Sequence, residues 1–241
     1  MILTAHQPAY LPWLGFFHKL LISDVFIILD NVQYQKNYFT NRNKIKTAQG
    51  RSTWLTIPIL TAGHFEKTIE NMEIDNKSRW RKKHWNSIDV HYKKAPFFYV
   101  YRDYFEALYN REWINLIDIL NETLRFFIKE LGIKTKIYFQ SELGFKEKKQ
   151  DLILEMCNYF DSDIFVFGRD GSRYADVDYF KQQKRNIYFQ DYNHPIYSQL
   201  YNDFIPNLSI VDLLFNVGAE AAVDIIIGKN DSKLDLIKKM S

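Results

Sequence analysis

The chain has 241 residues, of which 46% are hydrophobic and 25% are charged. This composition is typical of a soluble globular protein and excludes disordered, collagen-like and coiled-coil chains. Its single cysteine excludes a disulfide framework and a thiolate-rich metal site. The length favours one domain with a substantial core. We therefore expect residues 1–241 to form a single α/β domain, with a helical lobe at about 78–131.

The charge is unevenly distributed along the chain. The formal net charge is +3, yet residues 1–100 contain 14 Lys and Arg against 7 Asp and Glu, whereas residues 101–241 contain 18 against 22. A basic N-terminal half favours an anionic ligand. Met1–Tyr10 lacks the basic and apolar regions of a signal peptide, and no stretch approaches the roughly 20 apolar residues of a membrane span. We expect a cytoplasmic protein without a membrane span.

The first thirty residues predict a βαβ unit. Ile2–Ala5 reads as a short strand, and the prolines at 8 and 12 make the next segment a stiff loop. Trp13–Ile22 reads as a helix, and the apolar, β-branched run Val25–Leu29 as a buried strand. This order predicts a mostly parallel, Rossmann-like sheet with a right-handed crossover.

The remaining elements alternate between strands and helices. Asp30–Lys46 is polar and reads as a long loop. Strands are predicted at Thr53–Leu60, Thr68–Ile74, Ile137–Gln140, Ile164–Phe167 and Asn186–Gln190. Helices are predicted at about 78–92, 97–110, 113–131, 151–160, 209–217 and 220–227.

Polar side chains follow the first two predicted strands. His6 and Gln7 come after the first strand, and Asp30, Asn31 and Gln33 after the second. Ligands of open α/β sheets bind beyond the carboxyl ends of the parallel strands, so these side chains are expected to converge. His6 has the chemistry of a general base or acid, and Asp30 would orient it or bind a sugar hydroxyl. The alternative is that both residues only cap the ends of their strands.

Two basic segments are candidates for binding an anionic ligand. Asn41, Arg42, Asn43 and Lys44 offer amide groups and cations suited to a diphosphate, or they form a solvated loop. Residues 79–85 interleave basic and aromatic side chains; on a helix, Trp80 and His84 share a face. The alternative is an amphipathic helix with Trp80 in the core. No nucleic-acid motif is present, so we expect no nucleic-acid partner.

Other chemical motifs are weak or absent. The turn Gly168–Gly171 follows a predicted strand but is not a P-loop, and Cys157 reads as a core residue. The six histidines lack the spacing of metal ligands, so no metal cofactor is expected. No Gly-x-Ser-x-Gly elbow is present, which argues against a serine hydrolase.

The segment from His6 to Lys19 closely resembles the opening motif of the WbqC-like family. That motif reads His-Gln-Pro-x-Tyr-Leu-Pro-Trp-x-Gly, then an aromatic residue and a lysine. The resemblance covers nearly the whole chain, and it includes Leu29–Tyr34, Asn41–Asn43, the strand from Trp54 to Pro58, Trp80 with His84, Tyr92 with Ala95-Pro96, and Pro206–Asn216.

The resemblance implies a bacterial protein of surface-polysaccharide precursor synthesis, and it favours an N-acyl or aminoacyl transferase acting on a nucleotide-linked amino sugar. In that function His6 would act with Asp30, and Tyr10, Trp13 and Trp80 would stack on a ring. The other expected substrate-binding residues are Gln7, Lys19, Gln33, Asn41, Arg42, Asn43, Lys44 and His84.

The acyl donor stays open, as either an acyl thioester or an ATP-activated acid. At the level of fold, the first elements are similar to those of adenylyl transferases, although Trp13-Leu14-Gly15-Phe16 stands where those proteins have His-x-Gly-His. The alternatives are therefore an ATP-dependent activating enzyme or a non-catalytic protein that binds a nucleotide sugar or glycan.

Overall fold

The computed structural model describes residues 1–60, 67–201 and 203–240. Its centre is a five-stranded sheet with the order β5-β2-β1-β6-β7, in which every neighbouring pair is parallel. The strands are β1 (Ile2–His6), β2 (Val25–Ile28), β5 (Lys136–Phe139), β6 (Ile164–Phe167) and β7 (Asn186–Phe189). The predicted Rossmann-like α/β fold and its N-terminal βαβ unit are confirmed.

The order of the strands defines where a ligand is expected. From β1 at the centre, the chain first builds one half of the sheet with β2 and β5, then returns to add β6 and β7 on the other side. The direction of winding therefore reverses between β1 and β6. In open parallel sheets the crevice at this reversal, beyond the carboxyl ends of the two strands, is the usual ligand site. Here those ends are His6 and Phe167.

Helices cover both faces of the sheet. On one face, α6 (Lys149–Tyr159) and α7 (Val177–Gln182) pack against alternate strand residues such as Ile27 and Phe165. Cys157 lies in this core, where burial raises the pKa of its thiol to about 12, as expected of a structural cysteine. On the other face, α1 (Leu14–Leu21) contributes Phe16 and Phe17, which pack with Phe26 of β2.

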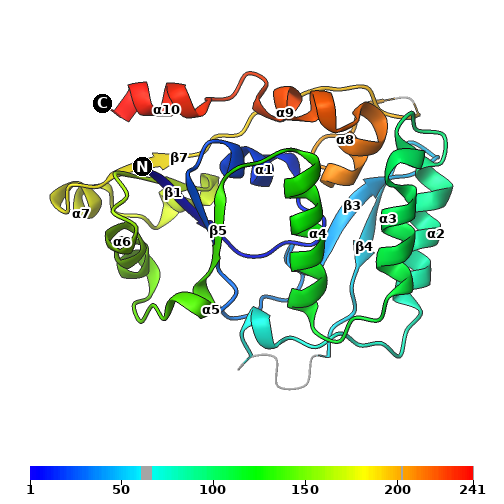
Figure 1. The fold of residues 1–241 in the computed structure, drawn as a ribbon, viewed down its shortest axis with the longest axis horizontal. Coiled ribbons are helices and arrows are strands. Elements are labelled where there is room, and N and C mark those ends of the chain that lie inside the picture. Colours follow the sequence, from blue (N-terminus) through cyan, green and yellow to red (C-terminus); the bar gives the residue numbers. More distant parts are fainter. Residues whose placement is uncertain (61–66, 202, 241) are drawn as a thin grey trace.

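The core beneath α1 continues into a group of helices at the end of the molecule away from α6 and α7 (Figure 1). Many aromatic residues lie here, and the ring of Phe215 contacts Tyr92 as well as Phe98, Tyr101 and Phe105. These helices are α2 (Trp80–Tyr92), α3 (Phe98–Asn110), α4 (Leu116–Glu130) and α8 (Ile210–Val217). The first three fall within the predicted span of 78–131.

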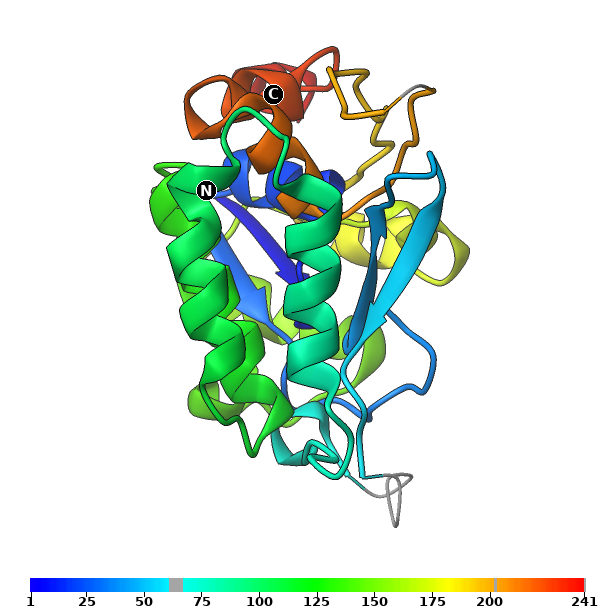
Figure 2. The ribbon, with the colours of Figure 1, turned by 90° about the vertical axis from the view of Figure 1, so that its right-hand side faces the viewer.

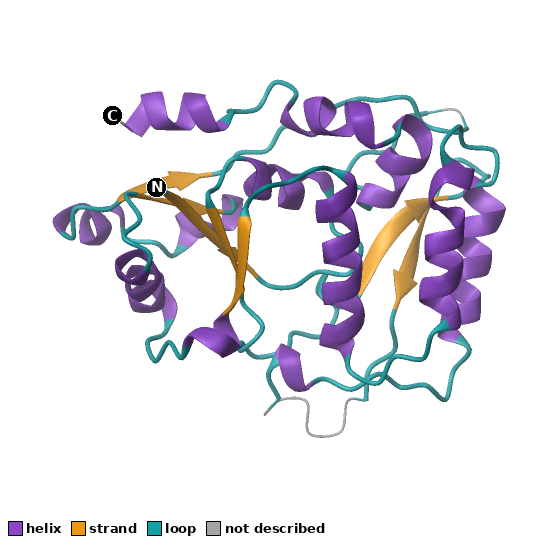
Figure 3. Cartoon of the chain, in the orientation of Figure 1, coloured by secondary structure: helices purple, strands orange, loops and turns teal. Residues whose placement is uncertain are grey.

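Beside α2 lies a two-stranded antiparallel ribbon of β3 (Arg42–Lys46) and β4 (Ser52–Thr56), shown in Figures 2 and 3. The prediction of a loop through Lys46 was wrong over β3. Four of its five residues are polar, but Asn43 and Ile45 alternate inward, and the buried Asn43 amide donates to the Leu11 carbonyl. The β4 strand ends at Thr56, earlier than predicted.

The predicted strand at Thr68–Ile74 is also wrong. Residues Ile69–Asn71 form one 3₁₀ turn, flanked by single bridges to other segments. Local hydrogen bonds favour the turn, since the Asn71 amide donates to the Thr68 hydroxyl and Asn71 N to the Thr68 carbonyl. Three short helices were not predicted, namely α5 (Gln140–Leu143), α7 and α10 (Lys233–Met240), whereas α9 (Ala219–Ile227) was.

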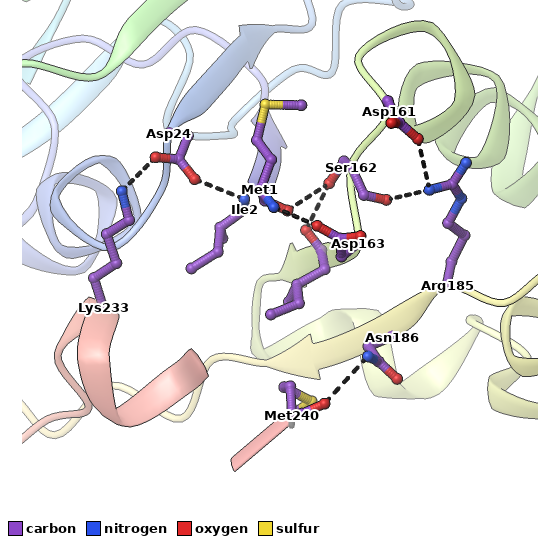
Figure 4. Close-up of polar contacts among 11 residues, drawn as sticks. Met1, Ile2, Asp24, Asp161, Ser162, Asp163, Arg185, Asn186, Lys233 and Met240 are labelled. Atoms are coloured by element: carbon purple, nitrogen blue, oxygen red, sulfur yellow. Dashed lines mark hydrogen bonds and ion pairs between the residues drawn. The ribbon is translucent and has the colours of Figure 1, made fainter. Parts of the chain in front are cut away.

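The α10 helix and a set of polar contacts, which Figure 4 shows, lie at the amino edge of the sheet. Asp24 accepts a hydrogen bond from Ile2 N at 2.8 Å and pairs with Lys233 of α10. The Asn186 amide donates to the Met240 carbonyl, and Leu236 is completely buried against β1 and β6. A hollow of about 680 Å³ also lies at this edge, with Asp24, Lys136 and Lys233 in its lining, so the carboxyl edge is favoured as a ligand site by the reversal of winding and not by its openness.

Candidate functional site

A cavity of about 380 Å³ lies at the point where the sheet reverses its winding. His6 comes from the end of β1, and Asp170 from the 3₁₀ turn Arg169–Arg173 directly after β6. The other walls come from separate segments. The lining residues are His6, Ala9, Trp13, Tyr38, Phe39, Asp170 and Asn207. The cavity thus combines one imidazole, one carboxylate and one amide with three aromatic rings.

The hydrogen bonding of His6 defines its tautomer. Its Nδ1 atom lies 2.8 Å from the Gln7 carbonyl oxygen, which only accepts, so Nδ1 carries the proton. Nε2 therefore has a free lone pair. Burial, followed by the nearby charge of Lys19, lowers the pKa of His6 to about 4. At neutral pH His6 is an uncharged imidazole that accepts a proton or a hydrogen bond through Nε2.

Lys19 is a buried lysine of α1 whose charge acts on His6. Only 2% of the residue is exposed, and its ammonium donates to the Ala5 carbonyl at 2.9 Å. Burial lowers its pKa to about 7. Lys19 does not line the cavity as the structure stands, so its electrostatic effect on His6 is its direct link to the site.

Asp30 follows β2 at the same edge of the sheet and joins two segments of that edge. Its carboxylate accepts hydrogen bonds from Ser141 N at 3.0 Å and Ser141 Oγ at 2.6 Å, which connects the end of β2 to α5. Gln7 also follows a strand, and its buried Oε1 has no hydrogen-bond partner among the described residues. Gln33 forms a bridge with Thr68, outside the cavity wall.

Asn41 joins the two ends of the β3–β4 ribbon, and Asn43 holds the ribbon against the proline-rich loop. The Asn41 amide donates to the Ile57 carbonyl at 2.7 Å, and the Asn43 amide to the Leu11 carbonyl at 2.6 Å. Tyr10 N donates to the Phe39 carbonyl at 3.1 Å, which fixes Phe39 at the cavity. Both asparagines are at least nine-tenths buried, so in this structure they position the wall rather than form it.

The segments that carry Trp13 and Asn207 are joined by backbone hydrogen bonds next to the cavity. Ile210 N donates to the Pro12 carbonyl and Ser209 N to the Lys44 carbonyl, so the segment before α8 is joined to both the loop and the ribbon. A Cβ at position 15 would lie 2.3 Å from the Trp13 ring. The glycine of the opening motif therefore leaves room for the indole.

Next to the Phe39 wall of the cavity lies a cationic aromatic surface, here called the Trp54 ledge and formed by Arg42, Lys44 and Trp54. The Arg42 guanidinium lies 4.3 Å and the Lys44 ammonium 4.8 Å from the Trp54 ring centre. Trp54 is 40% exposed, and its ring lies 5.8 Å from that of Phe39. Cations stacked on an exposed tryptophan next to a cavity are suited to a ligand that has both a ring and negative charge.

Tyr10, Trp80 and His84 lie below the surface in one network. His84 Nε2 must donate to the Thr56 carbonyl at 3.2 Å, so its Nδ1 accepts from the Tyr10 hydroxyl at 2.9 Å. The Tyr10 hydroxyl then accepts from Tyr109. Trp80 packs on His84 with ring centres 5.3 Å apart, which confirms that these two residues share a helix face. Burial lowers the pKa of His84 to about 4.

Replacing Tyr10 with phenylalanine should destabilise the protein by about 1–3 kcal/mol, because it leaves the buried Nδ1 of His84 without a donor. Urea unfolding at pH 7.5 measures this loss. Tyr99→Phe is the matched control: Tyr99 is 71% exposed, and its variant should change stability by less than about 0.5 kcal/mol. Equal stability of the Tyr10 variant and the parent protein would contradict the network.

Several residues of the site were not singled out from the sequence, namely Tyr38, Phe39, Trp54, Asp170 and Asn207. Tyr38 and Phe39 lie in a segment without periodicity. Asp170 belongs to the glycine-rich turn after β6. Ligands of parallel sheets bind beyond the carboxyl ends of the strands where the winding reverses, so the strand order would have indicated Asp170 had it been known. Trp54 and Asn207 belong to the segments that carry the family resemblance.

Two searches of the described parts of the chain gave negative results. No group of three or more His, Cys, Asp or Glu side chains within them is arranged to hold a metal ion. No helix in these same ranges has the length and apolar character needed to cross a membrane.

The fold and cavity define an α/β protein with a Rossmann-like parallel sheet and a ligand cavity at its switch point. Within that class, the model of the WbqC-like protein family matches residues 7–224, so the chain belongs to that family. It is similar to the uncharacterized protein Rv1507c of Mycobacterium tuberculosis, with 34% identity over 217 residues, which cover 89% of this chain and 93% of that protein. No solved structure matches the chain significantly.

Proposed function

We propose that this protein is a cytoplasmic N-acyl or aminoacyl transferase that forms an amide on a nucleotide-linked amino sugar for bacterial surface polysaccharide. The observation that carries the proposal is the free Nε2 lone pair of His6 in an aromatic cavity at the switch point, next to the cations of the Trp54 ledge. The cavity supplies a proton acceptor, and the ledge supplies a place for phosphate.

The reaction needs a base at the sugar amine. The neutral amine attacks the carbonyl carbon of an activated acyl group, and a C–N bond forms. One amine proton passes to His6 Nε2 as the bond from the acyl carbon to the leaving group breaks. The leaving group is the thiolate of a thioester or the phosphate oxygen of an acyl adenylate. Proton return from His6 to the solvent or the leaving group completes the cycle.

The other lining residues have binding roles in this proposal. Trp13, Tyr38 and Phe39 offer rings against which the apolar face of a sugar packs. Asp170 and Asn207 offer acceptors for the amine and hydroxyl hydrogens. Arg42 and Lys44 would hold the diphosphate. Asp30 and Lys19 lie outside the cavity: Asp30 binds Ser141, and the charge of Lys19 lowers the pKa of His6.

A second function, binding without catalysis, is favoured by one observation. The low pKa of His6 makes it a weak base, whereas a hydrogen-bond acceptor needs no particular pKa. Binding of a diphosphate would place negative charge near His6 and raise its pKa, which restores basicity in the complex. A measurement of amide product distinguishes the transferase from the binding function.

The test is to incubate the protein with UDP- or dTDP-linked amino sugars and with acyl-CoA, or with free acids or amino acids plus ATP, and to search for the amide by mass spectrometry. We expect an amide with one acyl donor and a rise in melting temperature with the sugar nucleotide alone. Arg42→Ala should reduce this rise. Arg102→Ala, an exposed arginine on α3, is the matched control and should preserve it.

Binding of the sugar nucleotide without an amide from any donor would replace the transferase by the binding function. The absence of both binding and product would contradict both functions.

A further inference from the structure

A second cavity, of about 350 Å³, lies on the ribbon side of α2. Its walls come from β4 and the segment after it, from α2, and from Ser78, two residues before α2 begins. The lining residues are Trp54, Leu55, Thr56, Pro58, Ser78, Lys83 and Ser87, together with the buried rings of Trp80 and His84. We call this space the α2 cavity.

The surroundings of the α2 cavity are strongly positive. Arg42 and Lys44 lie over its Trp54 wall, and Lys83 is in its lining. A neighbouring hollow of about 480 Å³ shares Ser78 with it. That hollow contributes four further cations: Lys77, Arg79, Arg81 and Lys82. Neither space has an Asp or Glu among its described lining residues, so both favour an anion.

The α2 cavity and the His6 cavity lie on either side of one aromatic pair. Phe39 lines the His6 cavity and Trp54 lines the α2 cavity, and their ring centres are 5.8 Å apart. A single extended ligand can therefore occupy both cavities by passing over this pair. The part in the α2 cavity would meet an exposed indole and several cations, whereas the part in the His6 cavity would meet the imidazole.

We propose that the α2 cavity is the subsite for the nucleoside diphosphate half of the substrate, with the base against Trp54 and the diphosphate on Arg42, Lys44 and Lys83. The sugar then extends past Phe39 to His6. The inference rests on the proposed function in that it assigns an orientation to that function's substrate. Exposed tryptophan and cations on one ledge match a planar base joined to two phosphates.

The test uses the full chain and the plain nucleotides UDP and dTDP, with binding measured by isothermal titration calorimetry. Both should bind, and uridine without phosphate should bind more weakly. Trp54→Ala should weaken UDP binding about 5- to 150-fold, the range expected for loss of a base–aromatic stack. Trp54→Phe keeps a ring and should recover most of the affinity. Lys83→Ala should weaken binding several-fold and reduce its dependence on salt.

Two exposed residues elsewhere supply matched controls. Tyr99, 71% exposed on α3, controls for loss of a surface ring, and Lys94, exposed after the end of α2, controls for loss of a surface cation. Tyr99→Ala and Lys94→Ala should bind UDP like the parent protein. Melting temperatures of all variants identify any that fail to fold, and Trp54→Phe keeps the test valid if Trp54→Ala is one of them.

The outcomes separate this inference from the proposed function. No binding of UDP or dTDP, or binding that the Trp54 and Lys83 variants leave unchanged, would overturn the subsite, while amide formation on a sugar would still support the transferase. Nucleotide binding that the Trp54 and Lys83 variants weaken, without amide formation, would support the subsite and contradict the transferase function. A single-stranded oligonucleotide that displaces UDP and binds more tightly would overturn the subsite in favour of nucleic-acid binding.

Discussion

In the proposed transferase reaction, His6→Ala should lower the turnover of amide formation by about 10²- to 10⁴-fold, the usual contribution of a positioned general base. The change removes the Nε2 lone pair in the cavity and leaves the aromatic walls and the Trp54 ledge in place. The dissociation constant of the sugar nucleotide should therefore change little. Steady-state kinetics of the variant, together with calorimetric titration of the nucleotide, measures the two effects separately.

The pH profile adds an independent check on His6. Because the pKa of His6 in the free protein is lowered to about 4, kcat/KM should show no loss from its protonation above pH 5 and should decline below that as the lone pair is protonated. Arg42→Ala is the comparison variant, since it should raise the dissociation constant and keep the shape of the profile. Turnover of His6→Ala within twofold of the parent would show that His6 is not the base.

Acidification from pH 6.5 to about 4 should destabilise the protein strongly, through histidines that are buried in their neutral form. Burial lowers the pKa of His84 and of His6 from 6.5 to about 4. Between these values the unfolded chain binds more protons than the folded protein, so stability falls as the pH falls, and it is unaffected by these groups above pH 6.5. His84 alone would contribute up to about 3 kcal/mol.

Urea unfolding at several pH values between 7.5 and 4.5 measures this loss. His84→Gln should flatten the pH dependence, since glutamine does not titrate but can still donate to the Thr56 carbonyl and accept from Tyr10. Paired carboxylates such as Asp24 have lowered pKa values and act only at more acidic pH, so they do not account for a loss above pH 5. An unchanged slope in the His84 variant would disprove its part in the effect.

Much of the parallel sheet could be predicted from the sequence, because its strands carry strong local signals. Val25–Ile28 and Ile164–Phe167 are short, continuous apolar runs, and they are buried along their whole length. The rule for parallel strand ends then directed attention to His6, which lines the cavity. The strand Arg42–Lys46 was not predicted, because it lacks such an apolar run. The burial of its polar residues Asn43 and Lys46 depends on hydrogen-bond partners in distant segments.

The composition of the site was less predictable, since it depends on contacts between remote parts of the chain. The sequence places Asp30 near His6, but only the fold brings Ser141 to its carboxylate across 111 residues. Likewise, the Trp54 ledge forms only in the folded ribbon, where Lys44 lies directly opposite Trp54 and Arg42 lies diagonally across from it. Tyr38 and Phe39 acquire a role only because the proline-rich loop folds back onto them.

The assembly of the His6 cavity has a consequence for synthesis on the ribosome. His6 is translated before Asp170 and Asn207, which also line the cavity, and β1 pairs with β6, which is likewise translated later. The complete cavity therefore forms only after nearly all of these segments have been translated. Truncated products of interrupted translation would lack it.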